Sequence, residues 1–307
     1  MELAFPPVYS HWTENARAHT PGLLFLTAKV YNYVQTCHNS VTPDFETESS
    51  MAEKSPEKSR LLLSMVALDT PSLPRQEEML KTLASLSGIT VSPLTVEAQE
   101  STLAFPLDGN TAAVAILPAP IPWSNLEGPC ETAWWWPDAS EKMRAHNSHL
   151  LVALRGESGN AARQSIALTH LTAAVAAHVD AAGIYWGGGA LVHDPQVFLE
   201  EARNASENNL PLHLWIDFRI ESNDDGTLRL FTTGMKTFDR MEIEIPHSGR
   251  EPAEVFEFAY SIADYILSRG AEVRDGHTVG RREDEKVLAT HAPSLWDNQM
   301  TVLRLDY

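Results

Sequence analysis

The chain has 307 residues and a mass of 34.0 kDa, enough for one large or two medium-sized domains. Hydrophobic residues make up 43% and charged residues 21%, fractions that are typical of a globular protein and exclude a disordered chain or a membrane protein. The 41 Asp and Glu residues outnumber the 23 Lys and Arg residues, and the net charge of −18 argues against nucleic acid or a membrane as a partner.

Residues 1–60 are expected to form an N-terminal extension and polar linker. The stretch 41–60 is rich in Ser and charge and has no sustained period, as is typical of a linker. The apolar run 22–34 contains Lys29 and Asn32, so it predicts one short strand or helix and not a signal peptide or membrane span. Two cysteines, Cys37 and Cys130, are too few for a disulfide framework, and reduced thiols in the cytoplasm are expected.

Residues 61–156 follow a regular pattern that predicts a first subdomain. Asp108-Gly109 is a strong signal for a two-residue hairpin turn between two apolar runs. The expected elements are a strand at 61–68, a helix at 76–86, strands at 101–107 and 111–117, a helix at 138–146 and a strand at 149–154. This order, βαββαβ, predicts a ferredoxin-like subdomain.

Residues 157–307 predict a second α/β subdomain. Asp194 is placed to cap a helix over 195–203, and Gly270 ends an amphipathic helix over 254–267. The other expected elements are a helix at 161–182, strands at 183–186, 212–220, 228–233 and 241–245, and short strands near 278, 287 and 302. The predicted class is therefore α+β, with mainly antiparallel sheets and helices packed on one face.

The sequence lacks the motifs of the well-marked enzyme classes. It contains no Walker phosphate loop, no G-x-G-x-x-G after a strand, no G-x-S-x-G, no H-E-x-x-H and no paired C-x-x-C. The twelve His residues, among them His247, His277 and His291, show none of the fixed spacings of a metal site. We therefore expect no metal and no cofactor, and the balance is against an enzyme.

Three successive tryptophans form the first candidate site. Trp134, Trp135 and Trp136 follow Glu127 and Glu131 and precede Asp138. Three consecutive side chains do not all point into one core, whether the backbone is a strand or a helix. At least one of these indoles is thus expected at a groove or recognition surface with acidic neighbours. The alternative is that they cover the open face of the first sheet.

A glycine-rich turn forms the second candidate. Trp186 is followed by Gly187, Gly188 and Gly189, whose backbone would allow the close approach of a ligand. His193 is a weak candidate for a general base, with Asp194 beside it. The alternative is a tight structural crossover, in which Asp194 caps the next helix.

The third candidate is an alternating strand. His213, Trp215, Asp217 and Arg219 would share one of its faces, since residues two apart point to the same side. Asp217 and Arg219 are weak catalytic candidates as the floor of a site. The alternative is an ordinary solvent-facing surface of an antiparallel sheet, or a face that packs on the other subdomain.

A set of short motifs is similar to one known family. They are PIPW, LEGPC and AWWWP within 120–137, GIYW at 183–186, LWIDF at 214–218, TTGMK at 232–236, MEIEIP at 241–246, DGHTVG at 275–280 and HAPS at 291–294. Over residues 61–307 the chain resembles the bacterial domain-of-unknown-function family 4261. The resemblance implies a bacterial, cytoplasmic, compact α+β protein, and it assigns no activity and no catalytic residue.

Two functions fit these patterns. The leading hypothesis is a non-enzymatic, immunity- or adaptor-like interaction module that binds a basic protein through an acidic, Trp-bearing surface. Its binding residues would be Trp134, Trp135, Trp136, Glu127, Glu131, Trp186, Gly187, Gly188 and Gly189. The alternative is a small-ligand-binding protein or hydrolase-type enzyme with a pocket between the two subdomains. The sequence leaves the oligomeric state open.

Overall fold

The computed structural model of the protein describes residues 59–92, 96–99, 101–157, 159–282, 284–297 and 299–307. The predicted extension, the apolar run 22–34, Cys37 and all but the last two residues of the predicted linker lie outside the described residues. The chain has two compact units, and the described part divides between Leu214 and Trp215. The boundary expected at residue 156 therefore falls inside the N-terminal unit, where strands before and after it belong to one sheet.

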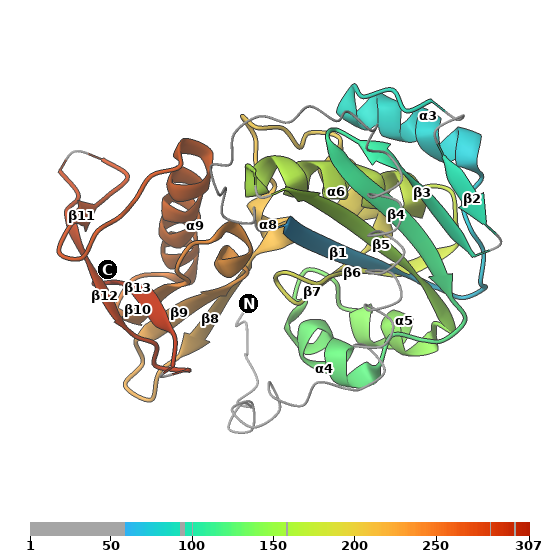
Figure 1. Ribbon diagram of the computed structural model, residues 1–307. Coiled ribbons are helices and arrows are strands. Elements are labelled where there is room, and N and C mark those ends of the chain that lie inside the picture. Colours follow the sequence, from blue (N-terminus) through green and yellow to red (C-terminus); the bar gives the residue numbers. More distant parts are fainter. Residues whose placement is uncertain (1–58, 93–95, 100, 158, 283, 298) are drawn as a thin grey trace, which may run out of the picture. The chain divides into compact units, whose positions relative to one another are not determined.

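The N-terminal unit is built on a seven-stranded antiparallel sheet with the order β2-β3-β4-β5-β1-β6-β7 (Figure 1). Its elements are β1 (Ser59–Leu68), α3 (Gln76–Ser87), β2 (Glu97–Gln99), β3 (Thr102–Leu107), β4 (Asn110–Leu117), α4 (Trp123–Thr132), α5 (Ala139–Ala145), β5 (Ser148–Glu157), α6 (Ala161–Ala176), β6 (Ala181–Trp186), β7 (Leu191–His193), α7 (Pro195–Ala202) and α8 (Leu212–Trp215), whose last residue begins the next unit.

The ferredoxin-like arrangement is wrong for this sheet. In that fold the first two strands of the βαββαβ unit are parallel, because a helix crosses over between them. In this chain these two strands are β1 and β3, joined by α3. Here three antiparallel pairings separate them, β1 with β5, β5 with β4 and β4 with β3, so β1 and β3 are antiparallel. A split βαβ unit exists elsewhere: β5 and β6 are parallel, α6 joins them, and β1 lies between them.

Helices cover both faces of this sheet, not one face as expected. Ser64 of β1 shares a hydrogen bond of 2.6 Å with Thr172 of α6, which places α6 on one face. Gly183 of β6 pairs with Ala67 and lies against Met143 of α5. Because residues 64 and 67 of a strand point to opposite sides, α5 lies on the other face, as Figure 1 also shows.

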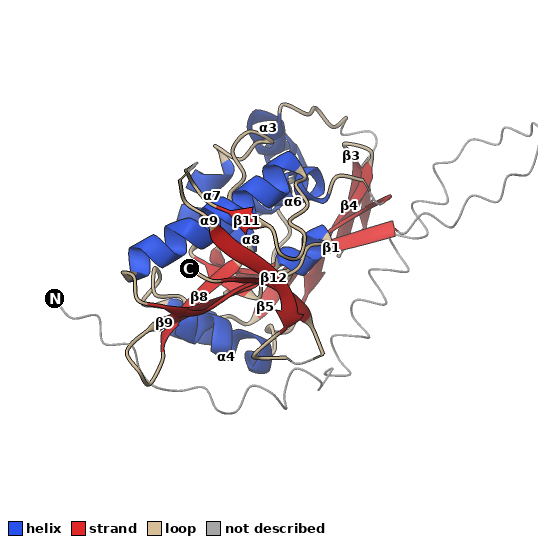
Figure 2. Ribbon diagram, turned by 90° about the vertical axis from the view of Figure 1, so that its left-hand side faces the viewer, coloured by secondary structure: helices blue, strands red, loops and turns tan. Residues whose placement is uncertain are grey.

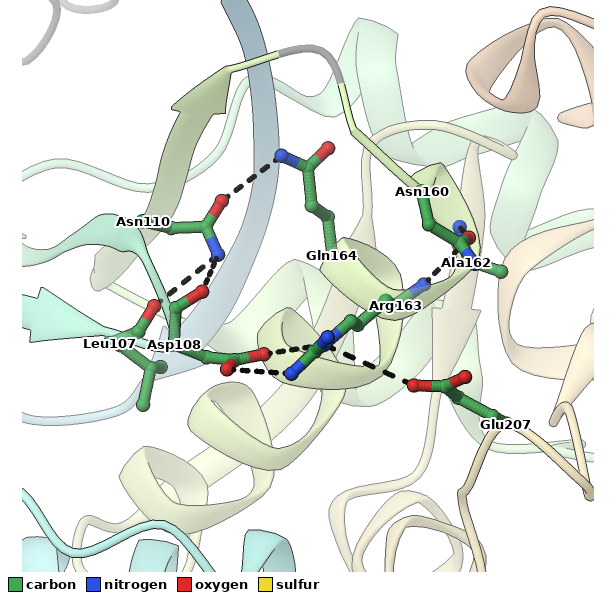
Figure 3. A network of polar contacts seen from close by, with 8 residues as sticks. All are labelled: Leu107, Asp108, Asn110, Asn160, Ala162, Arg163, Gln164 and Glu207. Atoms are coloured by element: carbon green, nitrogen blue, oxygen red, sulfur yellow. Dashed lines mark hydrogen bonds and ion pairs between the residues drawn. The ribbon is translucent and has the colours of Figure 1, made fainter.

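The hairpin between β3 and β4 is the one predicted, and it is tied to the start of α6 (Figure 3). Asp108 and Gly109 have φ values of 49° and 74°, the left-handed conformation that such a two-residue turn needs. The Asp108 carboxylate accepts two hydrogen bonds from the Arg163 guanidinium at 2.9 and 3.0 Å, and Gln164 donates to Asn110 at 3.0 Å. These bonds hold the turn of the β3–β4 hairpin against the start of α6.

The C-terminal unit has a six-stranded sheet with the order β11-β12-β13-β10-β9-β8. All its strand pairs are antiparallel except β10 with β13. Its elements are β8 (Asp217–Ser222), β9 (Leu228–Thr233), the 3₁₀ helix η2 (Met235–Phe238), β10 (Ile243–Ser248), α9 (Pro252–Arg269), β11 (Thr278–Val279), β12 (Val287–Pro293) and β13 (Thr301–Leu305).

Helix α9 packs along one side of this second sheet (Figures 1 and 2). Its apolar stripe is buried as the sequence predicts, through Val255, Phe258, Ile262 and Ile266. Phe218 of β8 meets Phe256 and Tyr260 of α9, each with ring centroids 5.5 Å apart. Gly270 ends the helix in the left-handed conformation, which confirms its predicted role. The α+β class is thus correct, with two largely antiparallel sheets.

Candidate functional site

The three tryptophans lie between α4 and α5, and they divide between surface and core. Trp136 is buried, and it packs on Gly183 of β6 together with Met143. A Cβ atom at Gly183 would lie 2.8 Å from the Trp136 ring and would collide with the Met143 sulfur. Only glycine leaves room for this indole, so Trp136 anchors the segment and is not itself a surface residue.

We expect Gly183→Ala to lower the free energy of unfolding by about 1–3 kcal/mol, because overpacking forces neighbouring side chains out of place. Urea unfolding measures the change. The matched control is Gly249→Ala, where an added Cβ meets no atom within 4 Å. Equal stability of the two variants would show that Trp136 does not need the glycine.

Trp134 and Trp135 are on the surface. Trp134 is 76% exposed and Trp135 is 37% exposed. Their ring centroids are 5.5 Å apart and the ring planes meet at 82°, an edge-to-face pair. Trp135 lies nearly parallel to the imidazole of His193, at 22° and 6.4 Å. We call Trp134 and Trp135 the indole pair.

His193 packs against Trp135 and supports the indole pair from the protein side. Its ring also meets Phe198 of α7 at 5.6 Å, and its Nε2–H donates to the Leu214 carbonyl at 3.2 Å. Burial lowers the pKa of His193 to about 3. A buried, neutral imidazole in this position supports Trp135, and it is out of reach of a substrate in solvent.

The stretch of sequence that contains the indole pair is acidic. Between Lys81 and Lys142 the chain has no Lys or Arg, while Asp or Glu stands at positions 97, 100, 108, 127, 131, 138 and 141. Glu131 and Asp138 flank the indole pair in sequence, and both residues are exposed. Along the chain, the charges next to the pair are therefore negative, and the first basic residues after it are Lys142 and Arg144 of α5.

Glu127 belongs to a neighbouring cluster on α4 and α5. Its carboxylate accepts a hydrogen bond from the Trp123 indole N–H at 3.1 Å and lies 3.9 Å from the Arg144 guanidinium. That guanidinium lies over the Trp123 ring, 3.6 Å from its centroid. Glu127 therefore already has a cation and an indole as partners.

Cys130, on the same helix, is a buried free thiol. Burial raises its pKa to about 12 from an ordinary value of 9.0. A rise of about three units lowers the thiolate fraction by about a thousandfold, and the thiolate is the reactive form.

In a Cys37→Ser variant we expect native protein to react with a disulfide reagent at least about a hundredfold more slowly than urea-unfolded protein. Rapid, complete labelling of the native protein would contradict this.

The glycine turn at 187–189 joins β6 to β7 and follows β1 closely. The Gly187 N–H donates to the Leu63 carbonyl at 3.3 Å, and a Cβ at Gly187 would lie 3.2 Å from the same oxygen. Gly188 is exposed, Gly189 is buried, and Trp186 is buried against Phe198 at 6.2 Å. These contacts belong to a tight hairpin turn, because β6 and β7 are antiparallel neighbours in the sheet.

Asp194 caps α7, as the sequence predicts. Its carboxylate accepts hydrogen bonds from the backbone N–H groups of Gln196 and Val197 at 2.9 and 3.1 Å.

The third candidate is corrected by the structure. Residues 212–215 form the short helix α8, and the strand begins only at Asp217, so the four side chains do not share a strand face. Trp215 is buried against Phe238, at 5.6 Å, and His213 lies 3.3 Å from Glu201 of α7. Alternation of polar and apolar residues over four positions fits one helical turn as well as a strand, which explains the error.

Asp217 and Arg219 form an ion pair on β8. The guanidinium of Arg219 donates to the Asp217 carboxylate at 2.6 Å. Burial raises the pKa of Asp217, and the neighbouring Arg219 acts to lower it. His193 belongs to the N-terminal unit and this ion pair to the C-terminal unit, so the three weak catalytic candidates are not one cluster within either unit.

Sequence reasoning missed two buried carboxylates on β10 and the turn before it. Glu242 accepts hydrogen bonds from Thr232 Oγ1 at 2.7 Å and from the N–H groups of residues 234, 235 and 236 at 3.0–3.2 Å. Glu244 accepts from Ser294 Oγ at 2.5 Å, from the Leu295 N–H at 3.2 Å and from Arg304 at 3.3 Å. The only signal in the sequence is the pair of acids in the apolar run MEIEIP.

These two networks join the motifs that carry the family resemblance. Glu242 and Glu244 belong to MEIEIP, the donors at 232–236 are TTGMK, and Ser294 ends HAPS. Both carboxylates are enclosed and serve to fix backbone turns. In this part of the chain these motifs therefore stabilise the fold.

Within the described ranges, no group of three or more His, Cys, Asp or Glu side chains is placed to hold a metal ion. None of the helices in this part of the chain combines the length and the apolar character needed to cross a bilayer.

No curated protein and no solved structure matches the chain. A family model does match residues 231–306, from β9 to β13, within the longer range 61–307 expected from the motifs. Over residues 231–306 the chain resembles the family described as a domain of unknown function, DUF4261.

Proposed function

We propose that the protein is a non-enzymatic interaction module of a bacterial cytoplasm, with an immunity- or adaptor-like role, and that its indole pair binds a basic protein. The observation that carries this proposal is the exposure of Trp134 and Trp135 next to the buried side chain of His193, which packs against Trp135. Two neighbouring indoles in water cost free energy that burial under a partner recovers.

The packing beneath the indole pair supports a binding role, because Trp136 and His193 hold the segment that exposes the two indoles. Trp136 fixes the segment on one side of the pair, and His193 supports the ring of Trp135 from below. A partner would therefore meet side chains that are already ordered, so little conformational entropy is lost on binding. Tryptophans in such a position are the residues that most often dominate the binding energy of an interface.

The charge pattern indicates the kind of partner. Glu131 and Asp138 flank the pair, both are exposed, and no Lys or Arg lies between them, which favours a basic partner over an acidic one. Long-range attraction raises the association rate and weakens with salt, whereas the burial of the indoles slows dissociation.

The test compares three full-length proteins as affinity baits in a bacterial lysate. They are the unmodified chain, the double variant Trp134→Ser/Trp135→Ser, and the control Tyr265→Ser, which removes an exposed aromatic residue of α9. A captured protein is then purified, and its Kd for each bait is measured at low and high salt.

We expect a basic protein whose Kd rises at least about tenfold for the double variant and stays unchanged for Tyr265→Ser. The association rate should fall as salt increases. Equal affinity of all three baits, or the recovery of no binding protein by the unmodified chain, would contradict the proposal.

A further inference from the structure

In the α4–α5 region, an indole and a carboxylate together contact the guanidinium group of one arginine. The Arg144 guanidinium lies 3.6 Å from the centroid of the Trp123 ring. The Glu127 carboxylate accepts a hydrogen bond from the Trp123 indole N–H and lies 3.9 Å from the same guanidinium. An arginine is thus held by an aromatic face and a carboxylate at once. This combination suits a guanidinium, which is flat, weakly hydrated and able to stack.

The segment that contains the indole pair has the same two residue types, exposed indoles and carboxylates close to them in sequence. Trp134 is 76% exposed, so most of its surface is accessible to a partner. Glu131 precedes it by three residues, and Asp138 follows it by four. Among the described residues, Arg144, Arg219, Arg229, Arg250 and Arg281 lie over aromatic rings, and none of these rings is Trp134 or Trp135.

We propose that the indole pair is a binding site for an arginine side chain of the partner, stacked on Trp134 with Glu131 and Asp138 supplying the opposite charge. This inference rests on the proposed function and makes it more specific. Trp is the aromatic residue that attracts cations most strongly. Arginine is favoured over lysine because its planar group stacks on the ring and still presents N–H donors to a carboxylate.

The probes are three short peptides of equal length that carry four Arg, four Lys or four citrulline residues between glycines. Citrulline has nearly the shape of arginine and no charge, so it separates charge from shape. Binding to the full-length protein is followed by indole fluorescence and confirmed by calorimetry. The protein variants are Trp134→Ala, Trp134→Phe, Asp138→Asn and the control Tyr265→Ala.

We expect the Arg peptide to bind about two- to fivefold more tightly than the Lys peptide and at least about tenfold more tightly than the citrulline peptide. Trp134→Ala should remove the preference for Arg, Trp134→Phe should retain part of it, and Tyr265→Ala should leave it unchanged. Asp138→Asn should weaken binding and reduce its dependence on salt.

Three results would overturn the inference: equal affinity for the Arg and Lys peptides, no binding of the Arg peptide at millimolar concentration, or an unchanged preference in Trp134→Ala. The two proposals fail in different ways. If a captured partner needs the indole pair but the peptides show no preference for Arg, the interaction role stands and the arginine site is wrong. If capture does not need the pair, the interaction role itself is wrong.

Discussion

Acidification from pH 7 to pH 5 should remove part of the stability that the neutral His193 side chain contributes at pH 7. The folded state holds this imidazole neutral, with a pKa of about 3 against an ordinary value of 6.5. The unfolded chain therefore takes up a proton below pH 6.5 that the folded chain refuses. The stabilisation is complete above pH 6.5 and is lost progressively as the pH falls towards 3. At pH 5 the loss from His193 alone is about 2 kcal/mol.

The physical reason is burial, which disfavours the charged imidazolium of His193. Its Nε2–H already donates to Leu214, and the ring lies between Trp135 and Phe198. Three further buried histidines, His146, His149 and His170, also have lowered pKa values because of burial, so they act in the same direction. His146 accepts a hydrogen bond from the Ile121 N–H at 2.7 Å, which a proton on that nitrogen would break.

Urea unfolding between pH 5 and pH 7 measures this dependence, in a range above the titration of ordinary carboxylates. Replacement of His193 by Leu should flatten the slope by up to about 1.4 kcal/mol per pH unit, whatever it does to the stability at pH 7. The matched control is His247→Leu, which replaces an exposed histidine of β10. A slope that is the same in His193→Leu and in the unmodified chain would contradict the assignment.

Local features of the fold were predictable because each depends on a few neighbouring residues. The turn at Asp108-Gly109 needs two residues that accept a positive φ, and the cap at Asp194 needs a carboxylate next to the first free N–H groups. The stripe on α9 depends only on spacing. In each case the cause of the structure lies within one or two turns of chain.

The remaining features depend on contacts between distant residues, which a single sequence does not reveal. β1 lies between β5 and β6 although more than 70 residues separate it from either of them. The sequence showed that Trp134, Trp135 and Trp136 do not all fit one core, but Gly183, about 50 residues later, decides that Trp136 is the buried one. Ser294 likewise stands 50 residues from its partner Glu244.

The second large effect is expected at Glu242. Replacement by Ala should lower the free energy of unfolding by about 3–5 kcal/mol, since it removes a buried acceptor and leaves its donors enclosed. Those donors are the Thr232 hydroxyl and the three consecutive N–H groups after Thr233. Burial raises the pKa of Glu242, and these hydrogen bonds act to lower it. The carboxylate is thus tolerated in the interior because of the donors, and the donors are satisfied because of the carboxylate.

Glu242→Gln provides the sharper test, because it keeps the volume and replaces one acceptor oxygen by an amide group that only donates. Each oxygen of Glu242 accepts two hydrogen bonds, so either orientation of the amide sets a donor against two donors. We expect this variant to lose nearly as much stability as Glu242→Ala in urea unfolding. The control Glu254→Ala, in the exposed first turn of α9, should cost no more than about 1 kcal/mol. If Glu242→Gln is as stable as this control, the turn at 234–236 is held by its own backbone, and the acids of MEIEIP need another explanation.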